Sequence, residues 1–230
     1  VYIWLCIKYI TGMYFYRLTI LLPACKADRY PLSFHRQRSV QCLMKFLAIV
    51  GSAMSGGNTD LLTDAFLKGV AEQGHTVVKI HLGETRIGPC LGCNACAQSG
   101  VCVQADGMQQ LLPAFLDCDV VVFATPVYFW GISAQLKAVI DRLYVLGQKD
   151  PKGYYRYPQK CCVFLATAAD SPRHFWTFEL VEQYYHRLVH YLRWTDLGIL
   201  TAGGCGGTAV PRCIEQTDQL QRAHCFGRKI

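Results

Sequence analysis

Four cysteines within a short segment are the strongest chemical feature of the sequence. Cys90, Cys93, Cys96 and Cys102 follow the spacing C-x2-C-x2-C-x5-C, and the first three match the spacing of a bacterial ferredoxin run. Such a run supplies four thiolates from one compact loop, as a [4Fe–4S] cluster requires. Zinc is the second alternative, although zinc-binding thiols usually come as two separated pairs. Cysteines that hold no metal are the third.

A glycine- and serine-rich segment, GSAMSGGNT over 51–59, joins a predicted buried strand to a predicted helix. Free N–H groups at a helix N-terminus, together with hydroxyl and amide side chains, favour an anion. The spacing Gly51-x4-Gly56 begins like a nucleoside triphosphate loop, but Gly57 stands where that loop needs its lysine, and no G-x-G-x-x-G fingerprint is present. The segment is therefore typical of a monophosphate site, or of a β–α turn without a ligand.

A second unusual loop, TPVYFWGIS over 125–133, carries three aromatic residues where solvent is expected. Pro126 and Gly131 constrain its backbone. Such a loop suits a flat ring that needs stacking and backbone hydrogen bonds. An apolar loop buried in a subunit interface is the alternative, and both interpretations can hold together.

The order of these segments carries a resemblance to a known family. GSAMSGGNT, the cysteine run followed by Gly107-Met108, and then ATPVYFWGISAQLKAVIDR resemble the NAD(P)H-dependent FMN reductase group of flavodoxin-like proteins, in particular its iron–sulfur flavoprotein branch. The resemblance covers roughly Met44 to the end and is strongest up to Tyr144. It implies that the FMN phosphate is surrounded by Ser52, Ser55, Gly57, Asn58 and Thr59. It also implies that the isoalloxazine ring is cradled by Pro126, Val127, Tyr128, Phe129 and Gly131, with Thr167 and Ala168 beside it.

One departure from the family concerns charge. Many members have Pro-Arg where this chain has Ala53-Met54. The phosphate loop therefore lacks one positive partner, and backbone N–H groups and hydroxyls must supply more of the binding.

The activity implied by the resemblance is an FMN-dependent NAD(P)H oxidoreductase. Hydride would pass from nicotinamide C4 to flavin N5 while the rings stack over Tyr128 and Phe129, without an acid–base side chain. A cluster at the four cysteines would then release single electrons to an unknown small-molecule or protein acceptor. A non-enzymatic flavodoxin-type electron carrier and a flavin/thiol redox sensor are the alternatives. Carriers are typically acidic where they dock, whereas this chain is slightly basic, which favours the enzyme.

The elements that must position these loops alternate between strand and helix. Short apolar runs predict five strands, at Phe46–Val50, Thr76–Leu82, Asp119–Ala124, Cys162–Thr167 and Leu197–Thr201. Amphipathic helices are predicted between them, one of them capped by Ser133, and Ile214–Phe226 is the closing helix. Pro113 predicts a short or kinked helix before the third strand. The predicted fold class is α/β, a flavodoxin-like doubly wound five-stranded parallel sheet with helices on both faces, whose ligands bind beyond the carboxyl ends of the strands.

Composition limits the cellular context and the partners. With 230 residues, 52% of them hydrophobic, the chain can bury a substantial core. Its thirteen cysteines are an odd number in a long chain, so a reducing, cytoplasmic compartment is expected rather than a disulfide scaffold. The net charge is +7, of which residues 1–43 contribute +5 and the remainder +2, so nucleic acid is not an expected partner. The aromatic loop predicts a homo-oligomer.

Residues 1–43 are not expected to be part of this fold. Lys8 and Arg17 interrupt the apolar runs that a membrane helix needs, so no membrane partner is expected. Leu18–Ala24 followed by Cys25 resembles a lipoprotein signal, but the run is short and contains Pro23. We favour a non-domain extension from an over-extended reading frame, with the domain occupying residues 44–230 and starting at Met44.

Two remaining features have ordinary explanations. Glu182, His186 and His190 share one helix face, which is more typical of a solvated polar surface than of a metal site. Cysteines outside the run are expected to be structural, including Cys118, Cys161, Cys162, Cys205, Cys213 and Cys225.

Overall fold

The computed structural model describes residues 7–9, 12–14, 43–153, 155–171, 174 and 176–230. The chain divides into two compact units, Val1–Val40 and Gln41–Ile230. In the first unit, the short strands β1 (Ile7–Tyr9) and β2 (Gly12–Tyr14) pair antiparallel, a local pairing that the sequence did not predict. The lipoprotein-like stretch 18–25 lies outside the described residues. The proposed start at Met44 therefore stays a prediction.

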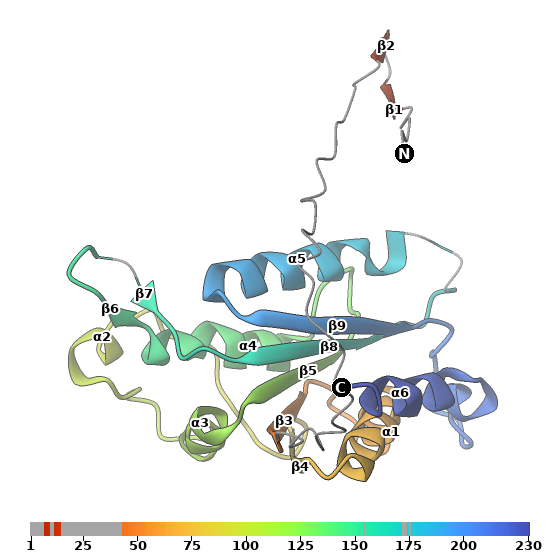
Figure 1. Cartoon of the computed structure of the whole chain (residues 1–230), viewed down its shortest axis with the longest axis horizontal. Helices are drawn as coiled ribbons and strands as arrows, with labels where there is room; N and C mark the ends of the chain where they lie inside the picture. Colours follow the sequence, from red (N-terminus) through yellow and green to blue (C-terminus); the bar gives the residue numbers. More distant parts are fainter. Residues whose placement is uncertain (1–6, 10–11, 15–42, 154, 172–173, 175) are drawn as a thin grey trace, which may run out of the picture. The chain divides into compact units, whose positions relative to one another are not determined.

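The second unit is built on a five-stranded parallel sheet, as predicted (Figure 1). Its strands lie in the order β4-β3-β5-β8-β9, which is 2-1-3-4-5 in order of sequence. The strands are β3 (Lys45–Val50), β4 (Thr76–His81), β5 (Val120–Pro126), β8 (Cys161–Thr167) and β9 (Thr195–Ala202). Central β5 is buried along its whole length, because helices cover both faces of the sheet.

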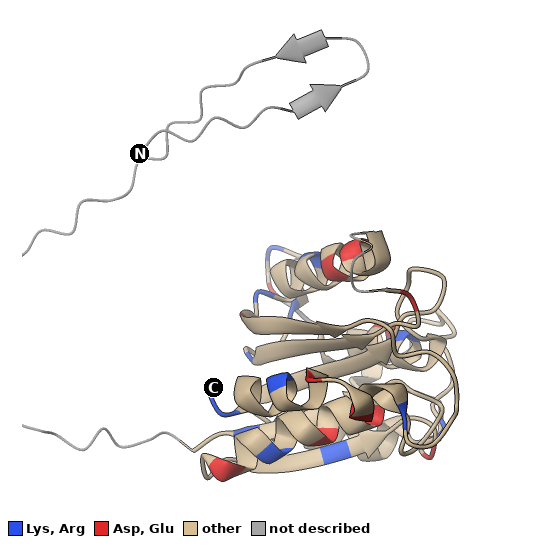
Figure 2. Cartoon of the chain, turned by 90° about the vertical axis from the view of Figure 1, so that its right-hand side faces the viewer, with Lys and Arg blue, Asp and Glu red and all other residues tan. Residues whose placement is uncertain are grey.

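Helices cover the two faces of the sheet unequally. On one face lie α3 (Met108–Asp117), α4 (Ala134–Arg142) and α5 (Trp176–Leu192), packed on residues such as Leu47 and Phe123. On the other lie α1 (Asn58–Glu72) and α6 (Gln219–Gly227), packed on residues such as Phe46 and Val122. Successive strand residues thus enter opposite cores, which confirms the doubly wound prediction. Helix α1 carries both acidic and basic residues, whereas α6 carries Arg222 and no Asp or Glu (Figure 2).

Several local predictions are tested by these elements. Ser133 caps α4 as predicted, because its Oγ accepts a hydrogen bond from Leu136 N at 3.2 Å. Pro113 does not stop α3, which continues to Asp117. The closing helix is split: a 3₁₀ turn η2 (Cys213–Gln216) precedes α6. Between α4 and β8, the 3₁₀ turn η1 (Leu143–Leu146) leads into a small hairpin that the sequence did not predict, β6 (Gln148–Lys149) with β7 (Tyr155–Arg156).

The α1–α6 contact depends on two glycines and yields a stability prediction. A Cβ on Gly69 would lie 2.2 Å from His224 O, and a Cβ on Gly227 would lie 2.1 Å from Phe66 O. Neither carbonyl can move without moving its helix. Gly69→Ala should therefore destabilise the protein by roughly 1–3 kcal/mol, although alanine is the better helix former. Urea unfolding would measure this change. The neighbouring exposed Lys68→Ala is the control, and an equally stable Gly69→Ala would contradict the close packing.

Candidate functional site: two cavities at the two ends of helix α4

The first cavity, of about 280 Å³, lies beyond the carboxyl ends of the strands. Four loops meet there, which follow β3, β5, β8 and β9. Nine of the twelve predicted cofactor-binding residues line it: Ser52, Gly57, Asn58, Thr59, Pro126, Val127, Tyr128, Thr167 and Ala168. The sheet topology thus brings together residues more than a hundred positions apart. We refer to this space as the flavin cavity, for the cofactor expected from the sequence.

The phosphate end of the flavin cavity is the N-terminus of α1. Gly57 is the N-cap residue, and no side chain caps the helix, so its first N–H groups are available to an anion. Ser52 Oγ accepts a hydrogen bond from Met54 N at 3.1 Å, which shapes the turn. Gly56, at φ +65°, adopts a backbone conformation that favours glycine. Ser55 is exposed in this turn and does not line the cavity.

A buried acidic residue supports the same turn. Asp60 Oδ2 accepts a hydrogen bond from Gly56 N at 2.8 Å, and Lys79 Nζ lies 2.9 Å from Asp60 Oδ1. Burial raises the pKa of Asp60, but Lys79 and the Gly56 N–H outweigh it, so the pKa lies below its ordinary value. Lys79 thus offsets a carboxylate that would otherwise oppose an anion at the helix N-terminus.

The ring end of the cavity is made by the ends of β5 and β8. Val127 N donates to Thr167 O at 2.7 Å, which ties the two walls together. Thr59 Oγ1 and Thr167 Oγ1 lie 2.6 Å apart, both buried, and join the phosphate end to the ring end. These hydroxyls use part of their hydrogen-bonding capacity on each other.

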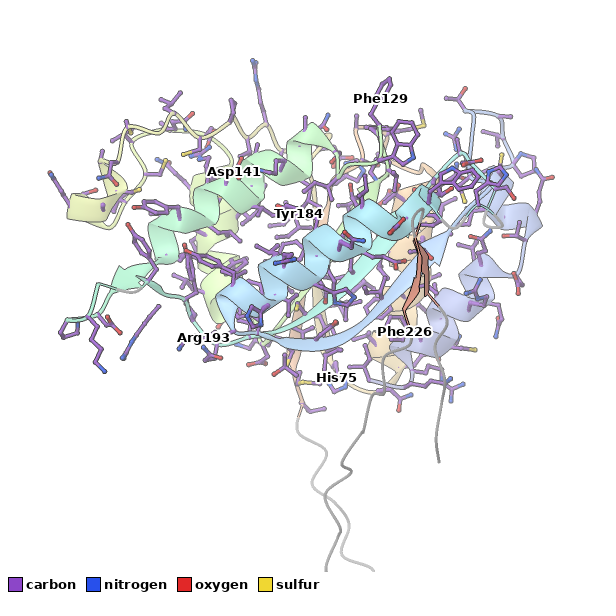
Figure 3. All side chains as sticks on the ribbon, turned by 90° about the horizontal axis from the view of Figure 1, so that it is seen from above. His75, Phe129, Asp141, Tyr184, Arg193 and Phe226 are labelled. Carbon is purple, nitrogen blue, oxygen red and sulfur yellow. The ribbon has the colours of Figure 1, made fainter. Side chains whose placement is uncertain are left out.

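The aromatic loop forms a tight turn. Tyr128 and Gly131 exchange two backbone hydrogen bonds of 3.0 Å. Phe129 and Trp130 occupy the turn with φ +46° and +58°, a strained conformation for bulky residues that is often found at functional sites. Phe129 is 96% exposed and projects at the edge of the domain (Figure 3). Phe129 and Gly131 therefore lie outside the flavin cavity, and Phe129 instead lines a smaller neighbouring hollow with Trp130 and Thr177.

Sequence reasoning missed one wall of the flavin cavity. The loop after β9 contributes Cys205, Gly206, Gly207, Thr208 and Arg212. A signal was present, because this glycine-rich stretch directly follows the fifth predicted strand and must leave the same edge of the sheet. Arg212 is the only Lys or Arg among the described residues that line the cavity.

The second cavity, of about 370 Å³, is lined by all four cysteines of the run. Asp141 and Tyr144, from the C-terminal end of α4 and the turn after it, form another part of its wall. No described residue lines both this cysteine cavity and the flavin cavity. The loop that contributes Pro126, Val127 and Tyr128 to the flavin cavity leads into the other end of α4, which Ser133 caps.

The four thiols share a cavity without forming a finished metal centre. Cys90 and Cys93 are exposed, whereas Cys96, in the short helix α2 (Cys96–Ser99), and Cys102 are partly buried. Burial raises the pKa of Cys96, and the neighbouring thiols, Cys102 first, raise it further. Among the described residues, no group of three His, Cys, Asp or Glu side chains is already arranged to hold a metal ion. The donor set fits four-thiolate ligation in number and chemistry, and binding a metal would require the thiols to move closer together.

A buried arginine anchors the cysteine loop to α4. The side chain of Arg142 is 1% exposed, and its Nη1 lies 2.5 Å from Asp106 Oδ2. Its Nη2 donates to Cys102 Sγ at 3.3 Å, and its Nη1 also approaches Gly88 O at 3.3 Å. One guanidinium therefore holds the beginning and the end of the loop that carries the four cysteines.

Among the described residues, the polar face of α5 shows no arrangement for a second metal site. His186 and His190 are exposed, and His186 Nδ1 lies 3.5 Å from Asp196 Oδ2.

In the part of the chain that the structure describes, no helix is long and apolar enough to cross a membrane.

The fold and the flavin cavity define a flavodoxin-like protein with a cavity at the switch in strand order. Solved structures share this fold: an azoreductase from Bacillus anthracis has a TM-score of 0.62 at 19% identity, covering 82% of this chain and all of its own. The Trp repressor binding protein from Bacillus subtilis has a TM-score of 0.53 at 23% identity, covering 79% and 99%.

Residues 44–193 match the model of the NADPH-dependent FMN reductase family, and the chain belongs to that family. YwqN of Bacillus subtilis, whose name assigns it to the NAD(P)H-dependent FMN-containing oxidoreductases, is 30% identical over 165 residues, covering 70% of this chain and 86% of its own. An iron-sulfur flavoprotein of Archaeoglobus fulgidus is 38% identical over 113 residues, covering 49% of this chain and 51% of its own. This chain spans about half the length of the iron-sulfur flavoproteins that it matches. The family that the sequence resembles, the NAD(P)H-dependent FMN reductases, is thereby confirmed.

Proposed function

We propose that the protein binds FMN in the flavin cavity and passes electrons from NADH or NADPH, by way of a [4Fe–4S] cluster held by Cys90, Cys93, Cys96 and Cys102, to an acceptor. The observation that carries the flavin half is the convergence of four loops on one cavity at the carboxyl edge of the sheet. FMN supplies the chemistry, which is hydride acceptance at the flavin ring followed by release of single electrons.

The two ends of the flavin cavity have different roles in holding FMN. The N–H groups at the start of α1 bind the phosphate, and the walls from β5 and β8 orient the ring. Tyr128, with 56% of its surface exposed, lies where a nicotinamide ring could stack. No acid–base side chain is assigned, because hydride transfer needs orientation rather than proton transfer.

The cluster half of the proposal rests on the four thiols around the cysteine cavity and on the names of the iron-sulfur flavoproteins that match this chain. Zinc and metal-free thiols remain the alternatives. A homo-oligomeric state and cytoplasmic residence stay predictions.

The flavin half is tested by anaerobic reduction. Protein loaded with FMN should lose its oxidised flavin absorbance when NADH or NADPH is added without any partner protein. The same protein stripped of FMN is the control. A flavin that binds but is not reduced by either nicotinamide would contradict the enzyme and favour the electron carrier.

The cofactor preference is a separate expected result. FMN should bind the apoprotein at least about tenfold more tightly than FAD, because the cavity has one helix N-terminus for one phosphate and the sequence shows no second phosphate fingerprint. Titration followed by flavin fluorescence measures both affinities. Equal or tighter binding of FAD would show that the phosphate site is assigned wrongly.

A further inference from the structure

We infer that Arg212, on the loop after β9, supplies the cationic contact to the FMN phosphate and gives the site its preference for a phosphorylated flavin. This inference rests on the proposed binding of FMN in the flavin cavity. It names a residue that neither the phosphate-loop motif nor the comparisons assign.

The first argument is position. Arg212 lines the same cavity as Ser52, Asn58 and Thr59, although it lies about 150 residues later in the chain. Its Nε donates to Gly56 O at 3.1 Å, so the guanidinium is attached directly to the turn that ends at the uncapped start of α1. An anion held by those N–H groups would lie beside this side chain.

The second argument is unused hydrogen-bonding capacity. The guanidinium uses Nε for Gly56 O and Nη1 for the carbonyl oxygens of Thr208 and Ala209. Within the described part of the chain, Nη2 has no protein acceptor and no carboxylate forms an ion pair with Arg212. Glu215 accepts from the backbone N of Arg212 at 2.5 Å, not from its side chain. A charged amino group that is held in place and left unpaired is suited to a phosphate oxygen.

The third argument is charge. The phosphate loop itself, GSAMSGGNT, contains no lysine or arginine. The nearby cation Lys79 is already paired with Asp60 and Asp64. The phosphate dianion therefore depends on Arg212 for its nearest unpaired positive charge among the described residues that line the cavity.

Asn58 acts in this arrangement as a positioning residue. Its Nδ2 donates to Cys205 O at 2.9 Å, and its Oδ1 accepts from Ile214 N at 3.3 Å. The amide thus holds both sides of the loop that carries Arg212. The sequence implied a place for Asn58 around the phosphate; Asn58 lines the flavin cavity, and its side chain also holds this loop.

The test compares FMN with riboflavin, which has the same ring without the phosphate. Arg212→Gln should weaken FMN binding by about 10- to 100-fold, the range for losing a charge-assisted hydrogen bond, and leave riboflavin binding unchanged. The FMN affinity of Arg212→Lys should lie between those of the wild type and Arg212→Gln, because lysine keeps the charge and loses the planar fork. Arg222→Gln, an exposed position on α6, makes the same charge change and should alter neither affinity. Fluorescence titration of the apoprotein measures all of these.

Three outcomes would overturn the inference: an unchanged FMN affinity in Arg212→Gln, an equal loss of FMN and riboflavin affinity, or an equal loss in Arg222→Gln. A wild-type protein that binds no FMN would instead overturn the proposed function. Asn58→Ala supplies a second check: it should weaken FMN in the wild type but add little in Arg212→Gln, because both changes remove the same contact. Full additivity would contradict the positioning role of Asn58.

Discussion

Replacement of any one of the four cysteines of the run by alanine should remove most of the iron and leave FMN bound. Anaerobically purified wild-type protein should contain about four irons per chain, the stoichiometry of a [4Fe–4S] cluster. Cys96→Ala is the most informative change, since this thiol is partly buried in the cysteine cavity and lies among the other three. Flavin is retained because no described residue lines both cavities.

The measurements are iron and acid-labile sulfide content, flavin content and the visible spectrum. Cys225→Ala, on the exposed surface of α6, is the matched control and should keep both iron and flavin. Zinc would give a colourless metal that survives air and needs no sulfide. A preparation with flavin but no metal after iron-replete anaerobic expression would contradict both metal alternatives, and the flavin half of the proposal would stand alone.

The sheet was predictable from the sequence because local pattern and tertiary environment agree there. A parallel strand covered by helices on both faces has to be apolar at every position, and FLAIV and DVVVFA show this directly. The places of the loops after the first, third and fourth predicted strands follow from the same argument. The predicted strand ends differ from the observed ones by at most two residues, as at β5, which extends through Pro126, where Val127 N still bonds to Thr167 O.

Other features could not be read from local sequence, since they depend on contacts between distant residues. Phe129 and Trp130 are poor residues for positive φ, so nothing in the pattern TPVYFWGIS indicates a tight turn at its tip. Pro113 is tolerated inside α3, whose Met108, Leu111 and Phe115 are buried against the sheet, and this packing outweighs the lost hydrogen bond. The place of Arg212 depends on Asn58 and Gly56, about 150 residues earlier.

Arg142 is another residue whose role depends on contacts with residues far away in the sequence. Arg142 is the last residue of ATPVYFWGISAQLKAVIDR, and in the sequence it resembles an ordinary charged residue at a helix C-terminus. In the fold it is buried, and its Nε has no partner among the described residues. Burial raises the pKa of Asp106, but hydrogen bonds from Arg142 first, then from Gly88 N and Met108 N, bring that pKa below its ordinary value. The carboxylate thus joins the end of the cysteine loop to its beginning and to α3.

Arg142→Met should therefore destabilise the protein by on the order of 3 kcal/mol, because it leaves Asp106 without its cation. It should also lower the iron content, since it removes the N–H donor to Cys102 Sγ, and FMN should stay bound. Urea unfolding at pH 7 and metal analysis measure the two effects. Lys137→Met is the matched control on the same helix, because the Lys137–Asp141 pair is solvent-exposed and such pairs contribute at most about 1 kcal/mol.

The pH dependence of the stability lost in Arg142→Met distinguishes the contribution of the Arg142–Asp106 ion pair from that of the packed Arg142 side chain. A carboxyl whose pKa is lowered by folding contributes stability above its unfolded pKa, about 3.9, and loses that contribution as pH falls through its folded pKa. The difference in unfolding free energy between wild type and Arg142→Met should therefore narrow as the pH drops below about 4. A difference that stays constant at acid pH would show that Arg142 acts through its packed side chain alone. Arg142→Lys, which keeps the charge, should recover part of the stability at pH 7 but less of the iron, because an ammonium group cannot reach Asp106 and Cys102 with the same fork.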